Sequence, residues 1–266
     1  MNKFSPTWFS AVPTMHQAIL SRANKNFKII EKTKLRFIRS SSSSLPSKTM
    51  KEIEKTFQCP VIESYGMTEA SHQMTSNYLP PGKRIASKVG FPAGPEVQIM
   101  GENYSILKKE NIGEIVIKGE SVTKGYINNI EANNSSFVNG WFRTGDQGFY
   151  DREGFLQLTG RIKEIINRGG EKISPLEIDN AIMEHEGIFQ GISFPIYHSK
   201  LGEEVAAAII LKQDHKLTAL ELKNFLKNKL SSFKIPQKII FLDEIPKGKT
   251  GKLQRIGLAK KLGLEK

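Results

Sequence analysis

The distribution of helix and strand signals divides this chain into two parts and limits its fold more than any other feature. Residues 85–160 are rich in glycine and in short β-branched runs, and they carry no clear helix signal. Residues 164–266 instead alternate strand patterns with capped helices. The mixture predicts an α/β plus α+β fold with a domain boundary near residues 161–164.

Three segments carry the signals of amphipathic helices. Residues 45–57 repeat apolar side chains at helical spacing behind a proline. Residues 174–177, Ser-Pro-Leu-Glu, form a capping box with proline at the first helical position, and Gly187 is the expected stop. Residues 218–221, Thr-Ala-Leu-Glu, repeat that box. Short apolar or β-branched runs predict five strands, at residues 35–38, 61–62, 113–117, 205–211 and 238–242.

The composition is that of a globular protein without a membrane span. The chain has 266 residues, of which 38% are hydrophobic and 25% charged, so two compact units are expected. No window approaches the roughly 18 to 20 uncharged apolar residues of a membrane helix. The first residues lack the apolar stretch of a signal peptide, so a cytoplasmic location is expected. The single cysteine, Cys59, cannot form an internal disulfide and is expected to be a packing residue.

The net charge of +12 suggests nucleic acid, an acidic membrane, or a polyanionic small molecule such as ATP or coenzyme A as a partner. The lysines are spread along the chain rather than packed into one block. A solvated basic surface explains such a distribution better than nucleic-acid binding does. We therefore expect no nucleic-acid partner and no membrane partner.

Residues 65–69, Tyr-Gly-Met-Thr-Glu, combine side chains that suit a nucleotide site. An aromatic ring can stack on a base, glycine lets the backbone approach, a hydroxyl can contact phosphate, and a carboxylate can hold Mg²⁺. Three further blocks follow at residues 141–146, 160–175 and 246–252. In this order the four blocks resemble the adenylate-forming (AMP-binding) superfamily, which includes acyl-CoA synthetases, luciferases and peptide-synthetase adenylation domains.

The resemblance implies a division into two domains. Residues 1–162 would be part of the AMP-binding large domain, with a β-rich subdomain at about residues 85–160. Residues 163–266 would be a mobile C-terminal lid, and Lys163 would be the hinge about which it turns.

The resemblance also implies a role for each matching residue. Tyr65 would stack on the adenine, Asp146 would hold both ribose hydroxyls, and Arg161 would also reach the ribose. The implied nucleotide-binding residues are Ser41, Ser42, Glu63, Ser64, Tyr65, Asp146 and Arg161.

The implied chemistry needs a cation and a metal beside the phosphates. A carboxylate that attacks the α-phosphate of ATP builds negative charge, which a lysine and Mg²⁺ can stabilise in a dry, closed site. Lys252 would be that lysine, Thr68 would contact phosphate, and Glu69 would bind the metal. Mg²⁺ is thus the implied cofactor, with ATP and coenzyme A as cosubstrates. The implied coenzyme A contacts are Gly169, Gly170 and Lys172.

Within the superfamily the sequence is most similar to oxalate–CoA ligases and their small-acid relatives. The similarity is carried by residues 11–16, 39–45, 68–72 and 167–175. Polar Ser41 and His72 could bind a second carboxylate, as in oxalate, whereas a long-chain acid would need an apolar tunnel. His72 has an equally good explanation as a polar loop residue.

The sequence departs from the superfamily at its beginning. The Ser/Thr/Gly-rich loop that clamps the β- and γ-phosphates has no counterpart, so about half of the large domain is expected to be absent. We therefore expect a truncated or split ligase, with a complementary N-terminal half or a second copy of the chain as its partner. Three functions remain open: an acid–CoA ligase, an adenylating enzyme with another acceptor, and a non-catalytic protein that binds AMP or a partner.

Overall fold

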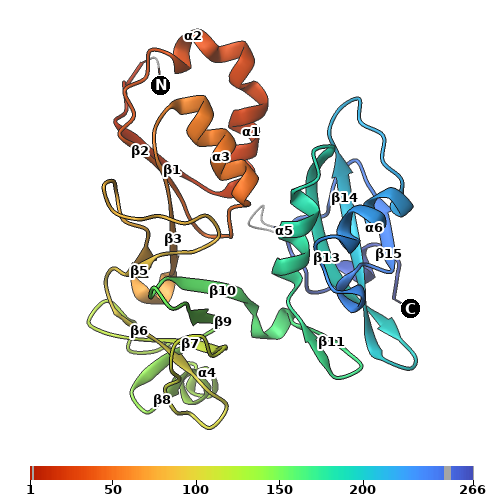
Figure 1. Ribbon diagram of the computed structural model, residues 1–266. Helices are drawn as coiled ribbons and strands as arrows, with labels where there is room; N and C mark the ends of the chain where they lie inside the picture. The colour runs from red at the N-terminus through yellow and green to blue at the C-terminus, as the bar shows by residue number, and fades with distance from the viewer. Residues whose placement is uncertain (2, 249–252, 266) are drawn as a thin grey trace. The chain divides into compact units, whose positions relative to one another are not determined.

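The computed structural model describes residues 1, 3–248 and 253–265, which form two compact units, Met1–Leu158 and Thr159–Lys266 (Figure 1). The boundary expected from the sequence, between residues 162 and 163, lies just beyond this division. The mixture of strands and helices in both units confirms the expected α/β and α+β class. Among the described residues, none of the helices has the length and apolar character that a membrane span needs.

The first sheet of unit 1 is parallel on one side and antiparallel on the other. Its strands run in the order β1 (Trp8–Ala11), β2 (Phe37–Ser40), β3 (Val61–Met67), β4 (His72–Ser76) and β5 (Phe91–Pro92). The first three strands pair in parallel and the last three antiparallel. Parallel neighbours need crossovers, which are supplied by the helices α1 (Pro13–Ala23), α2 (Phe27–Ile30) and α3 (Ser47–Phe57). Figure 1 shows α1 and α3 side by side next to this sheet.

Helix α3 confirms the helix predicted for residues 45–57. It buries Met50, Ile53 and Phe57, the side chains that its apolar pattern indicated. The strand predicted at residues 35–38 is β2, two residues further along the chain. Cys59 lies buried in the same apolar cluster, and burial and the nearby Glu54 carboxylate raise the pKa of its thiol to about 11, so it is a packing residue as expected.

The second sheet of unit 1 follows the first in the chain. Its order is β10 (Leu156–Arg161), β9 (Trp141–Tyr150), β7 (Gly113–Lys118) and β6 (Glu96–Met100), with β8 (Phe137–Val138) paired to β9. The expectation that residues 85–160 hold no helix is wrong, because α4 (Ile130–Ser136) forms there, capped by Asn129. This helix buries no residue, so it lacks the apolar stripe by which a sequence reveals a helix.

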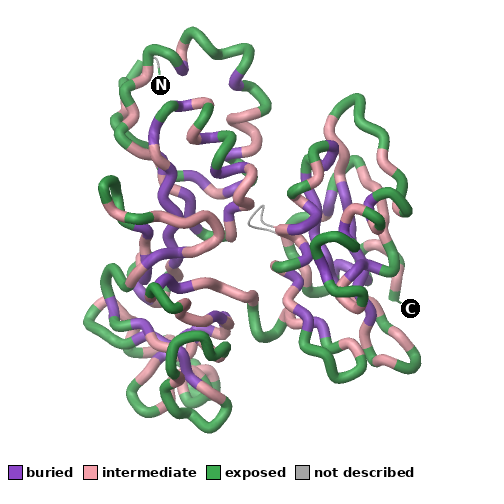
Figure 2. The backbone as a smooth tube through the Cα atoms, in the orientation of Figure 1, coloured by how far each residue is buried: buried purple, intermediate pink, exposed green. Residues whose placement is uncertain are grey.

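Unit 2 is a mixed sheet that is covered on both faces. Its strands run in the order β12 (Glu171–Ile173), β11 (Ile166–Arg168), β14 (Gly202–Leu211) and β13 (Ile188–His198), with β15 (Lys238–Phe241) parallel to β14. Alternate residues of β14 pack into two different apolar clusters, one on each face of the sheet. Ala207 and Ile209 pack with α5 (Pro175–Met183) and α6 (Ala219–Lys227), whereas Ala206 and Ala208 pack with α7 (Leu258–Lys261). Figure 2 shows the buried residues concentrated along these strands.

The two capped helices of unit 2 begin where the sequence predicted. Thr218 and Glu221 form the complete reciprocal capping box of α6. Ser174 caps α5 by accepting a hydrogen bond from the N–H of Glu177. The predicted stop at Gly187 is wrong, because α5 ends at Met183 and the chain turns before β13. Four short 3₁₀ turns complete the elements of the described residues, η1 (Asn24–Asn26), η2 (Thr68–Ala70), η3 (Ile162–Glu164) and η4 (Ser232–Lys234).

Candidate functional site

The carboxylate of Asp146 is directed into the interior of unit 1 by an irregularity in β9. Residues along β9 alternate between half-buried and buried, and Asp146 is on the buried side with 5% of its surface exposed. Gly145, just before it, has a positive φ of 73°, and the pairing of β9 with β7 shifts register there. The N–H of Asp146 donates to the hydroxyl of Thr144 at 3.1 Å, which in turn donates to the carbonyl of Ile115 at 2.7 Å. The position of this carboxylate is therefore fixed by the backbone.

Tyr65 and Asp146, two of the predicted nucleotide-binding residues, lie in direct contact. Tyr65 is near the end of β3, and its hydroxyl donates a hydrogen bond of 2.6 Å to Oδ2 of Asp146. Both side chains are buried. A hydrogen bond from a phenol to a carboxylate is short and strong, and it fixes the orientation of both groups. The fold thus joins the predicted adenine-stacking ring to the predicted ribose-holding carboxylate.

The predicted phosphate and metal residues occupy the turn η2 that follows β3. Thr68 is exposed, and the carboxylate of Glu69 accepts a hydrogen bond of 2.8 Å from the hydroxyl of Tyr126. The main chain of this turn is also held, because the N–H of Thr123 donates to the carbonyl of Glu69 at 2.7 Å. Burial and the Glu69 carboxylate raise the pKa of Tyr126, so this phenol stays a donor. Tyr126 was not among the residues that the sequence indicated.

The serine turn after β2 is held from inside by Glu63. One oxygen of the Glu63 carboxylate accepts from the N–H of Leu45 at 3.1 Å, and the other accepts from the N–H of Ser87 at 2.8 Å. Burial raises the pKa of Glu63 to about 7. The side chain of Glu63 is therefore occupied by the protein itself. Its carbonyl oxygen is also engaged, because it accepts from the N–H of Asn77 at 2.9 Å and from Nδ2 of Asn77 at 3.2 Å.

The predicted serines of this turn differ in accessibility. Ser42 is exposed and has a positive φ of 71°, whereas the hydroxyls of Ser41 and Ser40 are buried and make no hydrogen bond within the described residues. The hydroxyl of Ser64 donates to the carbonyl of Ser40 at 3.4 Å. Contact between a ligand and Ser41 would thus involve the backbone of the turn rather than its hydroxyl.

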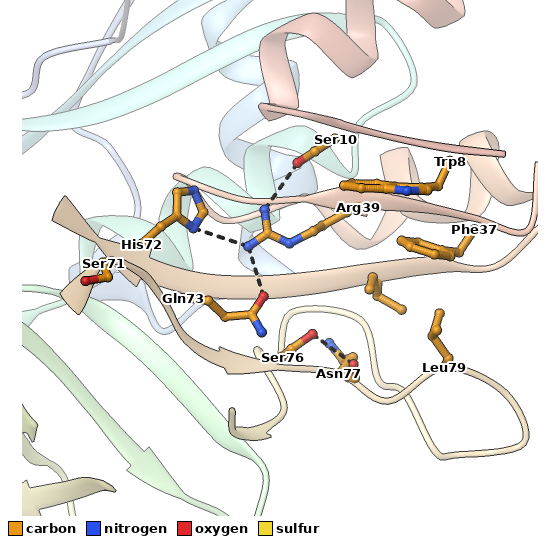
Figure 3. Close-up of a pocket in the computed structure, with 11 residues that line it drawn as sticks. Trp8, Ser10, Phe37, Arg39, Ser71, His72, Gln73, Ser76, Asn77 and Leu79 are labelled. Carbon is orange, nitrogen blue, oxygen red and sulfur yellow. Dashed lines mark hydrogen bonds between the residues drawn. The ribbon is translucent and has the colours of Figure 1, made fainter. Parts of the chain in front are cut away.

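His72 lies in a pocket of about 500 Å³ on unit 1 (Figure 3). Its ring faces the guanidinium of Arg39, which extends from β2 and also contacts Ser10 and Gln73. Ser41, the other predicted acyl contact, does not line this pocket. Arg39 was missed from the sequence, although a cation between two buried strand residues, Ile38 and Ser40, is an unusual pattern.

The predicted hinge lies in the 3₁₀ turn η3 of unit 2. Lys163 is exposed there, and Arg161 is the exposed residue that precedes the turn. The next residue, Glu164, accepts a hydrogen bond of 3.0 Å from Arg255, whose guanidinium also pairs with Asp179 at 3.0 Å. The end of the hinge is thereby fixed to the body of unit 2.

The three predicted coenzyme A contacts share one exposed hairpin. Strands β11 and β12 are joined by Gly169 and Gly170, whose φ values of 59° and 94° are those that a tight two-residue hairpin turn needs. Nothing lies within 4 Å of a Cβ built on Gly170. Lys172 stands on β12 opposite Asn167. Gly169 is less open, because its N–H donates to the carbonyl of Leu201 at 2.9 Å and a Cβ built on it would lie 3.0 Å from the side chain of Leu201. The open part of the turn is therefore Gly170.

The predicted catalytic lysine, Lys252, lies outside the described residues. On either side of it, Lys247 and Leu253 form a β-bridge.

Solved structures similar to this one include CoA ligases. The structure superposes on an anthranilate CoA ligase in complex with anthranoyl-AMP with a TM-score of 0.88 at 26% sequence identity, covering 99% of this chain and 51% of that one. The chain is 51% identical to an oxalate–CoA ligase of Saccharomyces cerevisiae over 95% of its length, and 46% identical to an oxalate–CoA ligase of Arabidopsis thaliana over 96%. It covers 46% and 50% of those two proteins, so it spans about half the length of the curated relatives it matches.

Two family signatures match in the expected order. The AMP-binding enzyme family matches residues 1–127, and the AMP-binding enzyme C-terminal domain matches residues 177–252. The chain belongs to the adenylate-forming, AMP-binding enzyme family, and within that family it is similar to oxalate–CoA ligases.

Proposed function

We propose that this chain is the part of an ATP-dependent acid–CoA ligase that holds the ribose and carries the mobile lid. The observation that carries the proposal is the buried contact between Tyr65 and Asp146. A carboxylate accepts from two neighbouring hydroxyls, and an aromatic ring beside it offers a face to the base. Arg161, the last residue of β10, would add a contact to the same ribose.

In the first proposed step, the carboxylate of the acid attacks the α-phosphate of ATP. An acyl-AMP forms and pyrophosphate leaves. The reacting phosphate gains negative charge, which Lys252 would stabilise as a point charge. Thr68 would donate to a phosphate oxygen, and the turn η2 would hold it in place because the N–H of Thr123 donates to the carbonyl of Glu69 and the N–H of Ser71 donates to the carbonyl of Thr68.

The residues present fit a magnesium ion that is bound together with the nucleotide. Among the described residues no cluster of three or more metal-ligating side chains exists, so a metal would depend on Glu69 and on substrate phosphates. Mg²⁺ prefers such a site, with one or two carboxylates and the remaining positions on phosphate and water. When bound, the ion would neutralise phosphate charge. Tyr126 donates to one oxygen of Glu69, which orients the carboxylate.

In the second proposed step, the thiol of coenzyme A attacks the acyl carbon and AMP leaves. The hairpin turn at Gly169 and Gly170 is exposed, and nothing lies within 4 Å of a Cβ built on Gly170, which suits a narrow path for the pantetheine arm. Lys163 would be the hinge about which the lid turns between the two steps, so that this hairpin replaces Lys252 beside the reacting groups. Lys172 would contact the cosubstrate from the same hairpin.

The acid is proposed to be small or dicarboxylic, with oxalate as the first candidate. Two relatives that carry that name are 51% and 46% identical to this chain. His72 would face the acid from the pocket on unit 1. The other proposed partner is a complementary N-terminal half, since the chain spans about half of those relatives.

The test measures pyrophosphate release and coenzyme A thioester formation over a panel of acids that includes oxalate. It uses the chain alone and the chain mixed with the N-terminal half of the Saccharomyces relative. Lys252→Ala is expected to abolish pyrophosphate release while sparing thioester formation from supplied acyl-AMP. Acyl-AMP without thioester would indicate another acceptor, and AMP binding without turnover in either mixture would indicate a non-catalytic protein.

A further inference from the structure

Arg39 is a half-buried cation that has only neutral partners. Its Nη1 donates to the hydroxyl of Ser10 at 3.2 Å, and its Nη2 donates to Oε1 of Gln73 at 3.2 Å and lies 3.4 Å from Nδ1 of His72. No described residue places a carboxylate within ion-pair distance of this guanidinium. Burial lowers the pKa of Arg39, and no neighbouring charge offsets the effect. A guanidinium removed from water without a counter-ion is costly.

Other partly buried arginines of unit 1 do have counter-ions. Arg84 pairs with Glu54 at 3.0 Å, and Arg143 pairs with Glu114 at 2.7 Å. Arg39 differs from them in lining a pocket. The missing negative charge is therefore expected to come from a ligand.

The pocket around Arg39 is polar on one side and apolar on the other (Figure 3). Ser10, His72 and Gln73 surround the guanidinium, while Trp8 and Phe37 stack with ring centroids 5.4 Å apart. Since arginine can only donate, the contact with Nδ1 requires that nitrogen to accept, which leaves the Nε2 position of a neutral His72 as a further donor. Donors thus gather at one end of the pocket.

The backbone that presents His72 is strained. Ser71 and His72 have positive φ values of 52° and 85°, which are rare for residues with side chains. Gly66 permits this approach, because a Cβ there would lie 1.5 Å from the carbonyl oxygen of His72. Strain of this kind persists where the surrounding structure enforces it, often at ligand sites.

We propose that Arg39 is a specificity-determining residue that binds the unreacted carboxylate of the acid and so selects a small dicarboxylate over a monocarboxylate. This inference rests on the proposed ligase function. A guanidinium can bind a carboxylate with two parallel hydrogen bonds, and a charged pair gains strength in a pocket that excludes water. Gln73 and Ser10 hold the side chain in place for that contact.

Calorimetric titration with oxalate and with acetate, in the presence of saturating AMP, tests the proposal. Arg39→Met is expected to weaken oxalate binding about tenfold or more and acetate binding less than about twofold, because a hydrogen bond to a charged group is lost only with oxalate. Arg39→Lys should restore part of the oxalate affinity. Arg36→Met is the matched control, since Arg36 is exposed and lies outside this pocket, and it should change neither affinity.

A second variant keeps the arginine and gives it a counter-ion from the protein. Gln73→Glu places a carboxylate on the atom that already contacts Arg39, so it should weaken oxalate binding as Arg39→Met does. An unchanged ratio of oxalate to acetate affinity in either folded variant overturns the role of Arg39. Failure of the unmodified chain to bind AMP would instead count against the ligase function, which separates the two outcomes.

Discussion

The hydroxyl of Tyr65 and the carboxylate of Asp146 form a buried hydrogen bond of 2.6 Å between strands β3 and β9. The two residues are 81 positions apart in the chain. Each belongs to a separate local motif, and unit 1 joins the motifs at one point. This contact ties the proposed base-stacking ring to the proposed ribose acceptor.

Replacing Tyr65 with Phe should weaken AMP binding. The variant keeps the ring but removes the hydroxyl that donates to Asp146, so we expect AMP affinity to fall about tenfold, as for a hydrogen bond to a charged group. Tyr150→Phe is the matched control. Its hydroxyl donates to the neutral carbonyl of Val97 at 2.9 Å, so its loss should cost about 1 kcal/mol of stability and leave AMP affinity intact. Equal affinities for the chain and Tyr65→Phe would contradict the assigned role.

The stability of unit 1 should fall between about pH 4.5 and pH 7 because of Glu63. Burial raises the pKa of Glu63 from 4.5 to about 7 in the folded protein. The folded state therefore binds this proton more tightly than the unfolded state does. The resulting stabilisation, about 3 kcal/mol, is present below pH 4.5 and is lost as the pH rises through 7.

Urea unfolding at pH 5 and pH 7.5 measures this loss. The Glu63→Gln variant cannot titrate, and it should be less stable at pH 5 but show a smaller decrease between the two pH values. If the chain and the variant lose stability equally over this range, Glu63 does not titrate there.

The exposed hairpin predicts a selective defect in the second step of the reaction. Gly170→Ala should raise the KM for coenzyme A and leave pyrophosphate release unchanged, because an added methyl group narrows the proposed path. Gly263→Ala is a suitable control, since Gly263 also has a positive φ, 68°, with nothing within 4 Å of a built Cβ. Both substitutions should cost about 1 kcal/mol of backbone strain. An identical change in KM for the two variants would mean that strain alone is responsible.

Removing Arg255 should destabilise unit 2 strongly. The guanidinium pairs with Asp179 and Glu164 at 3.0 Å, and although burial lowers its pKa, these two charges raise it overall. Arg255→Met would leave two partly buried carboxylates without a cation, which we expect to cost about 3–5 kcal/mol in urea unfolding. Lys229→Met, at the more exposed pair with Glu184, should cost less than about 1 kcal/mol. Similar losses for the two variants would contradict a structural role for the buried pair.

The sequence predicted elements whose signals are local. Helices α3 and α6 follow their apolar stripes, and α6 has both halves of its capping box. Strand β13 was missed because its apolar residues are interrupted by Gln190, Gly191 and Ser193 and by Pro195, and proline is disfavoured within sheets. The structure accommodates that proline at the edge of the sheet, beyond β14.

The residues of the candidate site also divide into those with a local sequence signal and those without one. Tyr65, Glu69 and Asp146 belong to short motifs that can be recognised without a fold. Arg39 and Tyr126 were missed because their significance depends on partners far along the chain, which only strand pairing brings close. Arg39 meets Gln73 34 positions away, and Tyr126 meets Glu69 57 positions away.

The most direct test of the account compares the binding of AMP and 2′,3′-dideoxy-AMP to the chain and to Asp146→Ala. If Asp146 holds the ribose hydroxyls, the chain should prefer AMP by about tenfold or more, and the variant should bind the two nucleotides nearly equally. Glu120→Ala, which removes the same charge from an exposed position, should keep the preference. Survival of the full preference in Asp146→Ala would show that this carboxylate does not contact the ribose.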